Sequence, residues 1–138
     1  MTNIDDLVEQ LKEAVQYQQL PEPIEDEEYQ QIVIHAIKRL YIDTGRAEVF
    51  SIDKIHEEDE QLVFDDDLII DEEEYVMLIC QILFFKKVQA SVNNIVGYTT
   101  NALTVTGADK PYTHIQDTIA NLENERRIVY YKMCRYTM

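Results

Sequence analysis

The chain has 138 residues, of which 46% are hydrophobic and 28% are charged, and its formal net charge is −15 at pH 7. A single domain commonly has ~100–150 residues, so we expect one domain, residues 1–138, with a sizeable buried core. The excess of acidic residues argues against a surface that grips DNA or RNA through phosphates, or that binds anionic membranes, because both depend on clustered lysine and arginine.

No apolar run approaches the ~20 residues that span a bilayer. The longest, "YVMLICQILFF" from Tyr75 to Phe85, is interrupted by Gln81. The first residues, "MTNIDDLVEQLKEAV", lack the basic head and apolar block of a signal peptide, so we expect synthesis in the cytoplasm. Cys80 and Cys134 have no second Cys or His at metal-binding spacing. We expect two reduced thiols, and a disulfide only if the helices that carry them meet at that level.

The first 44 residues contain two stretches with apolar residues at helical spacing. The first predicts an N-terminal helix within residues 1–20, running from Ile4 to about Gln19 with Asn3 as its N-cap. The prolines of "LPEPIEDEE" end it. The second stretch predicts a helix from Asp26 to Thr44, and Gly45 follows in the position expected of a left-handed C-cap.

Residues 46–70 read as an extended acidic insert. "EVFSIDKI" and "QLVFDDDLII" predict two short strands or two extended segments, for which a small hairpin is one arrangement. "HEEDE", from His56 to Glu60, is expected to be the solvated turn between them.

The third helix is predicted from roughly Glu72 to Val96, with Asp71 and Glu74 as a capping box. It is apolar over most of its girth, which is typical of a central helix that others cover on several sides. Its main apolar stripe consists of Tyr75, Leu78, Ile79, Ile82, Phe85, Val88 and Val92.

The stretch "GYTTNALTVTGADKPYTH" contains two of the three glycines and one of the three prolines of the chain. We predict that residues 97–113 form a shaped loop projecting from the helical body, with a short strand at "ALTVT". Thr113 and Gln116 would open the fourth helix, which continues to near the C-terminus. The fold class is therefore mostly α, a helical bundle with a long central helix, a small β or extended insert and a Thr-rich loop.

No arrangement of residues predicts catalysis. His35, His56 and His114 have no nucleophile partner, and no hydrolase, zinc-protease, phosphate-loop or dinucleotide motif is present. Asp65 and Asp67 fit the first two ligands of a calcium loop, but the following positions are isoleucines and the required glycine is missing. We therefore expect a protein that is not an enzyme, with no catalytic residues, no metal and no cofactor.

The C-terminal segment "RRIVYYKMCRY" combines basic and aromatic residues on an otherwise acidic chain. This composition suits head-to-tail self-assembly, in which the basic segment of one subunit meets the acidic face of the next. It is equally compatible with cations that complement the end of their own helix. The candidate interface residues are Arg126, Arg127, Tyr130, Tyr131, Lys132 and Arg135.

Two blocks, "YQQIVIHAIKRLYIDTGR" and the stretch from "DEEEYVMLICQILFFKKVQ" through "ASVNNIVGYTTNALTVTGADKPYTHIQDTIANLENERRIVYYKM", resemble the head–tail connector, or neck adaptor, proteins of tailed bacteriophages. The likeness is one of element order and loop character. It covers the chain from the second helix to the C-terminus. The acidic insert and the N-terminal helix depart from it.

The resemblance implies a virion structural protein of the neck, made in the host cytoplasm. It would form a homo-oligomeric ring, expected to be a dodecamer, that docks to the portal and joins the DNA-filled head to the tail and neck proteins. DNA would pass through an acidic lumen without specific binding. The partner-docking loop would present Tyr98, Leu103, Val105, Lys110 and Tyr112.

A second interpretation stays open from the sequence. An acidic regulatory protein that mimics DNA and binds a nucleic-acid-binding partner, or another non-enzymatic interaction domain, would also carry a charge of −15. A mimic would array its carboxylates on one face, whereas here they cluster at helix starts and turns. Binding by a mimic would weaken as salt rises, whereas an assembly held by apolar packing would persist.

Overall fold

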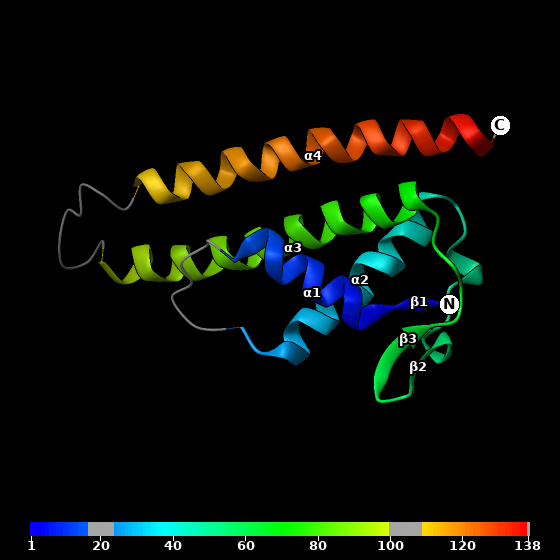
Figure 1. Cartoon of the computed structure of the whole chain (residues 1–138). Helices are drawn as coiled ribbons and strands as arrows, with labels where there is room; N and C mark the ends of the chain where they lie inside the picture. The colour runs from blue at the N-terminus through cyan, green and yellow to red at the C-terminus, as the bar shows by residue number, and fades with distance from the viewer. Residues whose placement is uncertain (17–23, 100–108, 138) are drawn as a thin grey trace.

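The computed structural model describes the backbone of residues 1–16, 24–99 and 109–137, and the side chains of these residues except 91–99, 109–113 and 135–137. Within these ranges the chain forms helices α1 (Ile4–Val15), α2 (Asp26–Asp43), α3 (Ile70–Thr99) and α4 (Asp109–Thr137), with a small antiparallel sheet beside them. Figure 1 shows α4 along one side of α3, with α1, α2 and the sheet on the other. The predicted mostly α class is confirmed.

The first two helices begin as the sequence predicts. The side chain of Asn3 caps α1, because its Oδ1 accepts the Asp6 N–H at 3.3 Å. The helix ends at Val15, earlier than expected, and residues 17–23 lie outside the described part. After α2, Gly45 has φ +74°, so the predicted left-handed cap is confirmed.

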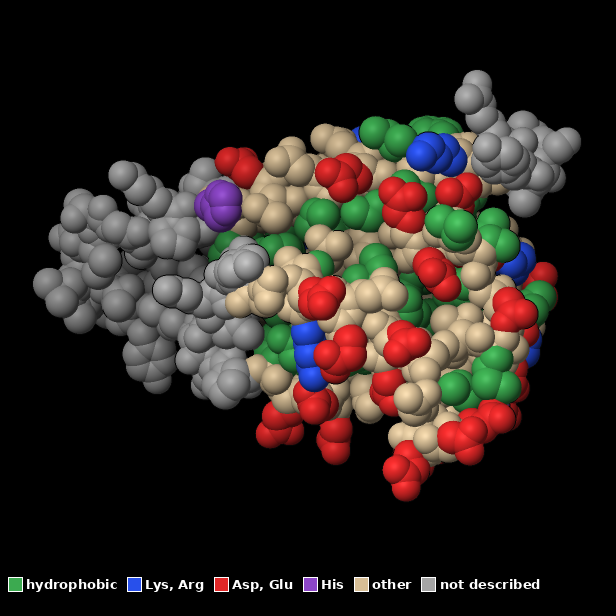
Figure 2. Space-filling view, in the orientation of Figure 1, with side chains coloured by type: hydrophobic (Ala, Val, Ile, Leu, Met, Phe, Trp, Pro, Cys, Tyr) green, Lys and Arg blue, Asp and Glu red, His purple; other side chains and the backbone are tan. Residues whose placement is uncertain are grey.

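The sheet has the order β1 (Thr2–Asn3), β3 (Gln61–Phe64), β2 (Ile55–Glu58). The predicted hairpin is confirmed, but its turn is shorter than expected. His56 to Glu58 belong to β2, and only Asp59 and Glu60 form the turn, both with positive φ. Most of "EVFSIDKI" forms the short 3-10 helices η1 (Ala47–Val49) and η2 (Ile52–Lys54) instead of a strand. Acidic side chains crowd the lower right of Figure 2, where this hairpin lies.

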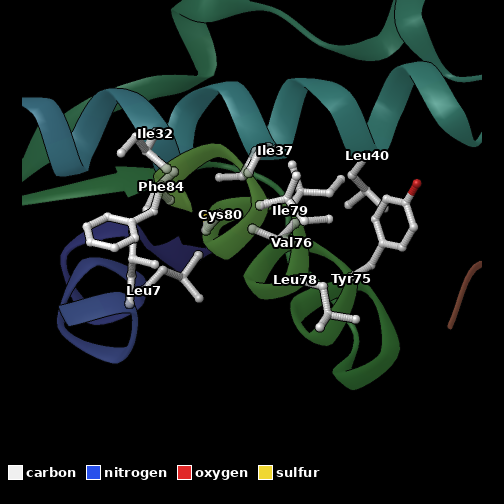
Figure 3. Close-up of a cluster of buried hydrophobic side chains, with 14 of the residues drawn as sticks. Leu7, Ile32, Ile37, Leu40, Tyr75, Val76, Leu78, Ile79, Cys80 and Phe84 are labelled. Atoms are coloured by element: carbon white, nitrogen blue, oxygen red, sulfur yellow. The ribbon is translucent and has the colours of Figure 1, made fainter. Parts of the chain in front are cut away.

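The central position of α3 follows from burial around its whole girth. Val76, Cys80 and Phe84 are four residues apart and share one buried face, and the buried Leu78, Ile82 and Phe85 lie on the opposite side. Figure 3 shows the side chains of the first face meeting those of α1 and α2, among them Leu7, Ile37 and Leu40. Aromatic rings also contribute to this core farther along α3, where Tyr29 of α2 stacks on Phe84 with 6.3 Å between ring centroids.

The capping box predicted for α3 is wrong by two residues. The helix begins at Ile70, and the Glu72 carboxylate accepts the N–H of Ile69 at 3.2 Å. Glu72 therefore supplies the carboxylate of the capping box in place of Glu74. In a capping box this carboxylate lies three residues beyond the residue whose N–H it accepts.

Both helices that flank the predicted loop are longer than expected. α3 continues through Gly97 to Thr99, and α4 begins at Asp109, so Thr113 and Gln116 do not open it. Pro111 lies in the first turn of α4, where its missing N–H would have no helical partner in any case. The rest of the predicted loop, including its strand, lies in residues 100–108, outside the described part.

α4 packs along α3 through one narrow stripe. Its buried residues Ile115, Leu122 and Val129 are seven apart, and Ile119 and Met133 follow the first and last of them by four. This heptad spacing is typical of helices paired as in a coiled coil. Arg126 follows Leu122 by the same four residues. The contact between α4 and α3, which we call the seam, is therefore apolar over its described residues apart from this one cation.

Candidate docking surface

An extended arrangement of polar and aromatic side chains lies where the last turns of α4 pass the end of α2 and the start of α3, at the right of Figure 1. Five of the six interface residues predicted from the sequence have described side chains there. Arg127, Tyr131 and Lys132 are exposed, while Arg126 and Tyr130 are half-buried. The backbone of Arg135 belongs to α4, and its side chain lies outside the described part.

A polar network ties α4 to the body at this place. The hydroxyl of the fully buried Tyr75 donates to Asp43 Oδ2 at the end of α2. It accepts a hydrogen bond from Arg126 Nη1 at 3.0 Å. Arg126 Nε donates to Glu123 Oε2 at 2.9 Å, and Arg39 Nε lies 3.1 Å from Asp43 Oδ1. We call Asp43, Tyr75 and Arg126 the clasp, because together they join α2, α3 and α4.

The clasp keeps its tyrosine neutral over the ordinary pH range. Burial, and then the hydrogen bond to the Asp43 carboxylate, raise the pKa of Tyr75 to about 12. The guanidinium of Arg126 also lies over the Tyr75 ring, 5.9 Å from its centroid. Each polar group of the clasp therefore has a hydrogen-bond partner within the chain. This arrangement favours a structural role for Arg126 over a contact with a neighbouring subunit.

Aromatic side chains extend the clasp towards the surface. The Tyr130 ring lies 6.4 Å from the Tyr75 ring, and the Tyr131 ring lies 5.9 Å from that of Tyr130. Tyr131 is 68% exposed, and the neighbouring Ile128 is 60% exposed. An apolar surface therefore continues from the buried seam to the outward face of α4.

A cavity of about 570 Å³ opens beside the clasp. This volume is within the range of sites that take up a small molecule or a partner's side chain. Arg46 is one of the residues that line this cavity. Its Nη2 forms an ion pair with Glu72 Oε2 at 2.5 Å, and its guanidinium lies 4.7 Å from the centroid of the Tyr41 ring. The lining residues are Asp43, Thr44, Gly45, Arg46, Ile69, Glu72, Tyr130, Met133 and Cys134.

The outward face of α4 carries unbalanced positive charge. Residues 126–134 contain three basic residues and no acidic one. Arg126 is held within the clasp, whereas Arg127 and Lys132 have no ion pair with any residue of the described part. Exposed charges of this kind are available to a second molecule.

Asp43, Tyr75 and Glu72 could not be recognised from the sequence as parts of this surface. Asp43 was predicted only as part of the helix from Asp26 to Thr44, and Tyr75 only as part of an apolar stripe, and the structure bears out both predictions. Only the placement of α4 beside them, 51 residues along the chain from Tyr75 to Arg126, turns them into one network. A lone arginine in the apolar series of α4 was the one available signal.

The second predicted group of site residues is not brought together in the described part. Leu103 and Val105 lie outside it. Tyr98 belongs to the last turn of α3, and Lys110 and Tyr112 belong to the first turns of α4, but their side chains are not described. Their role in docking stays a prediction.

The remaining candidate chemistry is modest. His56 lies between two carboxylates, 3.3 Å from Asp65 and 3.6 Å from Glu58, and the described residues contain no group of three or more side chains placed to hold a metal ion. Cys80 is buried and Cys134 half-buried, and neither forms a disulfide. Burial raises the pKa of the Cys80 thiol.

Comparison with family models, with curated proteins and with solved structures returned no match to this chain. In the part of the chain that the structure describes, every helix is too short or too polar to cross a membrane.

Proposed function

We propose that the chain is a non-enzymatic structural subunit of an oligomeric ring, the head–tail connector of a tailed bacteriophage. The observation that carries the proposal is the helical hairpin of α3 and α4. α4 is packed along α3 by a single stripe and leaves its outward face, with Ile128 and Tyr131, exposed. A surface of this kind is suited to burial against a neighbouring subunit.

The dimensions and rigidity of the hairpin support the proposal. Helices of 30 and 29 residues are each about 45 Å long at ~1.5 Å per residue. The heptad seam and the clasp hold them side by side, so we expect the chain to act as one elongated wedge. Wedges related by rotation close into a ring through contacts between unlike surfaces.

The charge of the chain supports a conduit for DNA. A formal net charge of −15 repels phosphate, so DNA can pass a ring of such subunits without being retained. The titratable groups gathered at the docking surface support a structural role as well. Tyr75 hydrogen-bonds both Asp43 and Arg126, so these three side chains are engaged in joining the helices.

The decisive experiment mixes the purified chain with the portal protein encoded beside it in the same genome and examines the mixture by electron microscopy. We expect an additional ring of density, coaxial with the portal, that is absent from the portal alone. Portal mixed with an unrelated helical protein of similar charge serves as the control. A portal that gains no density, together with a chain that fails to co-purify with it, would overturn the proposal.

A further inference from the structure

We propose that the outward face at the end of α4 binds the β2–β3 hairpin of a second copy of this chain, head to tail. The proposal rests on the proposed function for the neighbour's identity, and it names the two surfaces that meet. We call Arg127, Ile128, Tyr131 and Lys132 the α4 strip. The complementary surface is the hairpin tip, residues 57–60.

The α4 strip is one continuous patch. Arg127 and Tyr131 are four residues apart, as are Ile128 and Lys132, so all four side chains lie on one face of the helix. Two large apolar side chains, each at least 60% exposed, lie between two cations that have no ion pair within the described part. An apolar centre with a charged rim is the usual composition of a protein interface.

The hairpin tip offers the opposite charge. Glu57, Glu58, Asp59 and Glu60 are consecutive and all exposed. Among them only Glu58 has a basic neighbour in the described part, His56 at 3.6 Å. The exposed Ile52, in the 3-10 helix just before β2, lies beyond the open end of the hairpin and is not part of the acidic tip.

The two surfaces lie on opposite sides of the subunit. In Figure 1, α4 forms the top layer and the hairpin lies at the bottom, with α3 and then α1 and α2 between them. The α4 strip therefore cannot reach the hairpin of its own chain. Complementary surfaces on opposite sides give a head-to-tail contact, which repeats from copy to copy and closes into a ring if the rotation permits.

A charge swap tests this contact between copies of the full-length chain. One variant, R127E/K132E, makes the strip acidic, and a second, E57K/E60K, makes the tip basic. Sedimentation equilibrium at low salt, over micromolar to millimolar concentrations, gives the association constant. We expect the wild type to associate, each variant alone to associate at least tenfold more weakly, and their equimolar mixture to recover association, because each then presents the complement of the other.

The matched control is K38E/K86E. It makes the same change in net charge at two exposed lysines on α2 and α3, and it should associate like the wild type. A second measurement does not depend on any variant. Zero-length carbodiimide cross-linking of mixed isotope-labelled and unlabelled wild type should join Lys132 of one copy to a carboxylate of residues 57–60 of another.

The inference is overturned if the wild type stays monomeric throughout, if the mixture fails to recover association, or if the intermolecular cross-links lie elsewhere. These outcomes leave the portal experiment untouched, since a ring can form on a portal through other surfaces. Conversely, the mixture of variants could recover association while the chain fails to bind the portal. That result would support the contact between copies and would overturn the connector function.

Discussion

α3 and α4 are almost equal in length, but they relate to the rest of the molecule in different ways. α3 is covered by α1, α2 and α4, and it buries side chains all around its axis. α4 is held mainly by α3, and its buried residues follow one stripe. The difference shows that one helix carries the stability of the fold, whereas the other divides its surface between attachment and an outward face available to partners.

The largest effect is expected in the part of α3 that is covered on every side. Phe84 has no exposed surface and stacks on Tyr29, so Phe84→Ala should lower the free energy of unfolding by about 3–5 kcal/mol. Urea denaturation followed by circular dichroism measures the change. Ile128→Ala, on the outward face of α4, should stay within about 0.5 kcal/mol of the wild type. Equal losses at the two sites would contradict the comparison.

The inner stripe of α4 should respond less strongly than the core of α3. Leu122 is 9% exposed in the seam, and Leu122→Ala should cost about 2–3 kcal/mol, because the seam can partly close around the lost volume. The same denaturation experiment measures it. A loss as large as that of Phe84→Ala would mean that α4 is as much a part of the core as α3.

Alkaline pH should weaken the join between the two helices. Tyr75, with its pKa raised to about 12 by burial and by Asp43, stabilises the fold fully below its unfolded pKa of about 10. That contribution is lost as the pH rises from about 10 to 12 and amounts to about 2–3 kcal/mol. Urea unfolding at several pH values measures the slope.

The variants separate the contribution of Tyr75 from that of other tyrosines. Burial, followed by the hydrogen bond to Asp66, also raises the pKa of Tyr41 to about 12, so Tyr75→Phe should flatten the alkaline slope only in part. Ile128→Ala, which removes no titratable group, is the control and should leave the slope as it is. An unchanged slope in Tyr75→Phe would show that the clasp does not titrate in this way.

The smallest effect is expected for the cation in the seam. Arg126→Leu removes two hydrogen bonds but fills a seam position with an apolar side chain, and Tyr75 keeps Asp43 as its acceptor. Stability should therefore change by about 1 kcal/mol or less. The measurable consequence is in pairing specificity, because a polar residue in a heptad seam fixes its register. Double electron–electron resonance between labels on α3 and α4 should give a broader distance distribution than in the wild type.

The fold was largely predictable where apolar periodicity is strong. The stripes of α1 and α2, the girth of α3 and the left-handed Gly45 all follow from side-chain spacing and backbone sterics. The two-residue strand β1 was not predictable, because it is too short to show alternation. It exists because Thr2 and Asn3 pair with Phe64 and Val63, far along the chain.

Helix ends near glycine and proline were harder to predict. Gly97 and Pro111 were read as signals of a loop, but Gly97 continues α3 and Pro111 lies in the first turn of α4. The residue types of the candidate site were predictable, whereas their arrangement in space was not.

The basic and aromatic residues of the C-terminal segment were identified from the sequence. Their neighbours Asp43 and Tyr75 depend on the register of one helix along another, which no local pattern encodes.

The turn of the β2–β3 hairpin has a consequence for protein engineering. Asp59 and Glu60 both occupy the left-handed backbone region, with φ of 53° and 64°. Glycine and asparagine adopt this conformation at a lower energetic cost. Changing the pair to Asn-Gly should raise the melting temperature while removing two carboxylates from the loop tip. An optimisation guided by thermostability alone would therefore erase the charge on which recognition of a neighbouring molecule would depend.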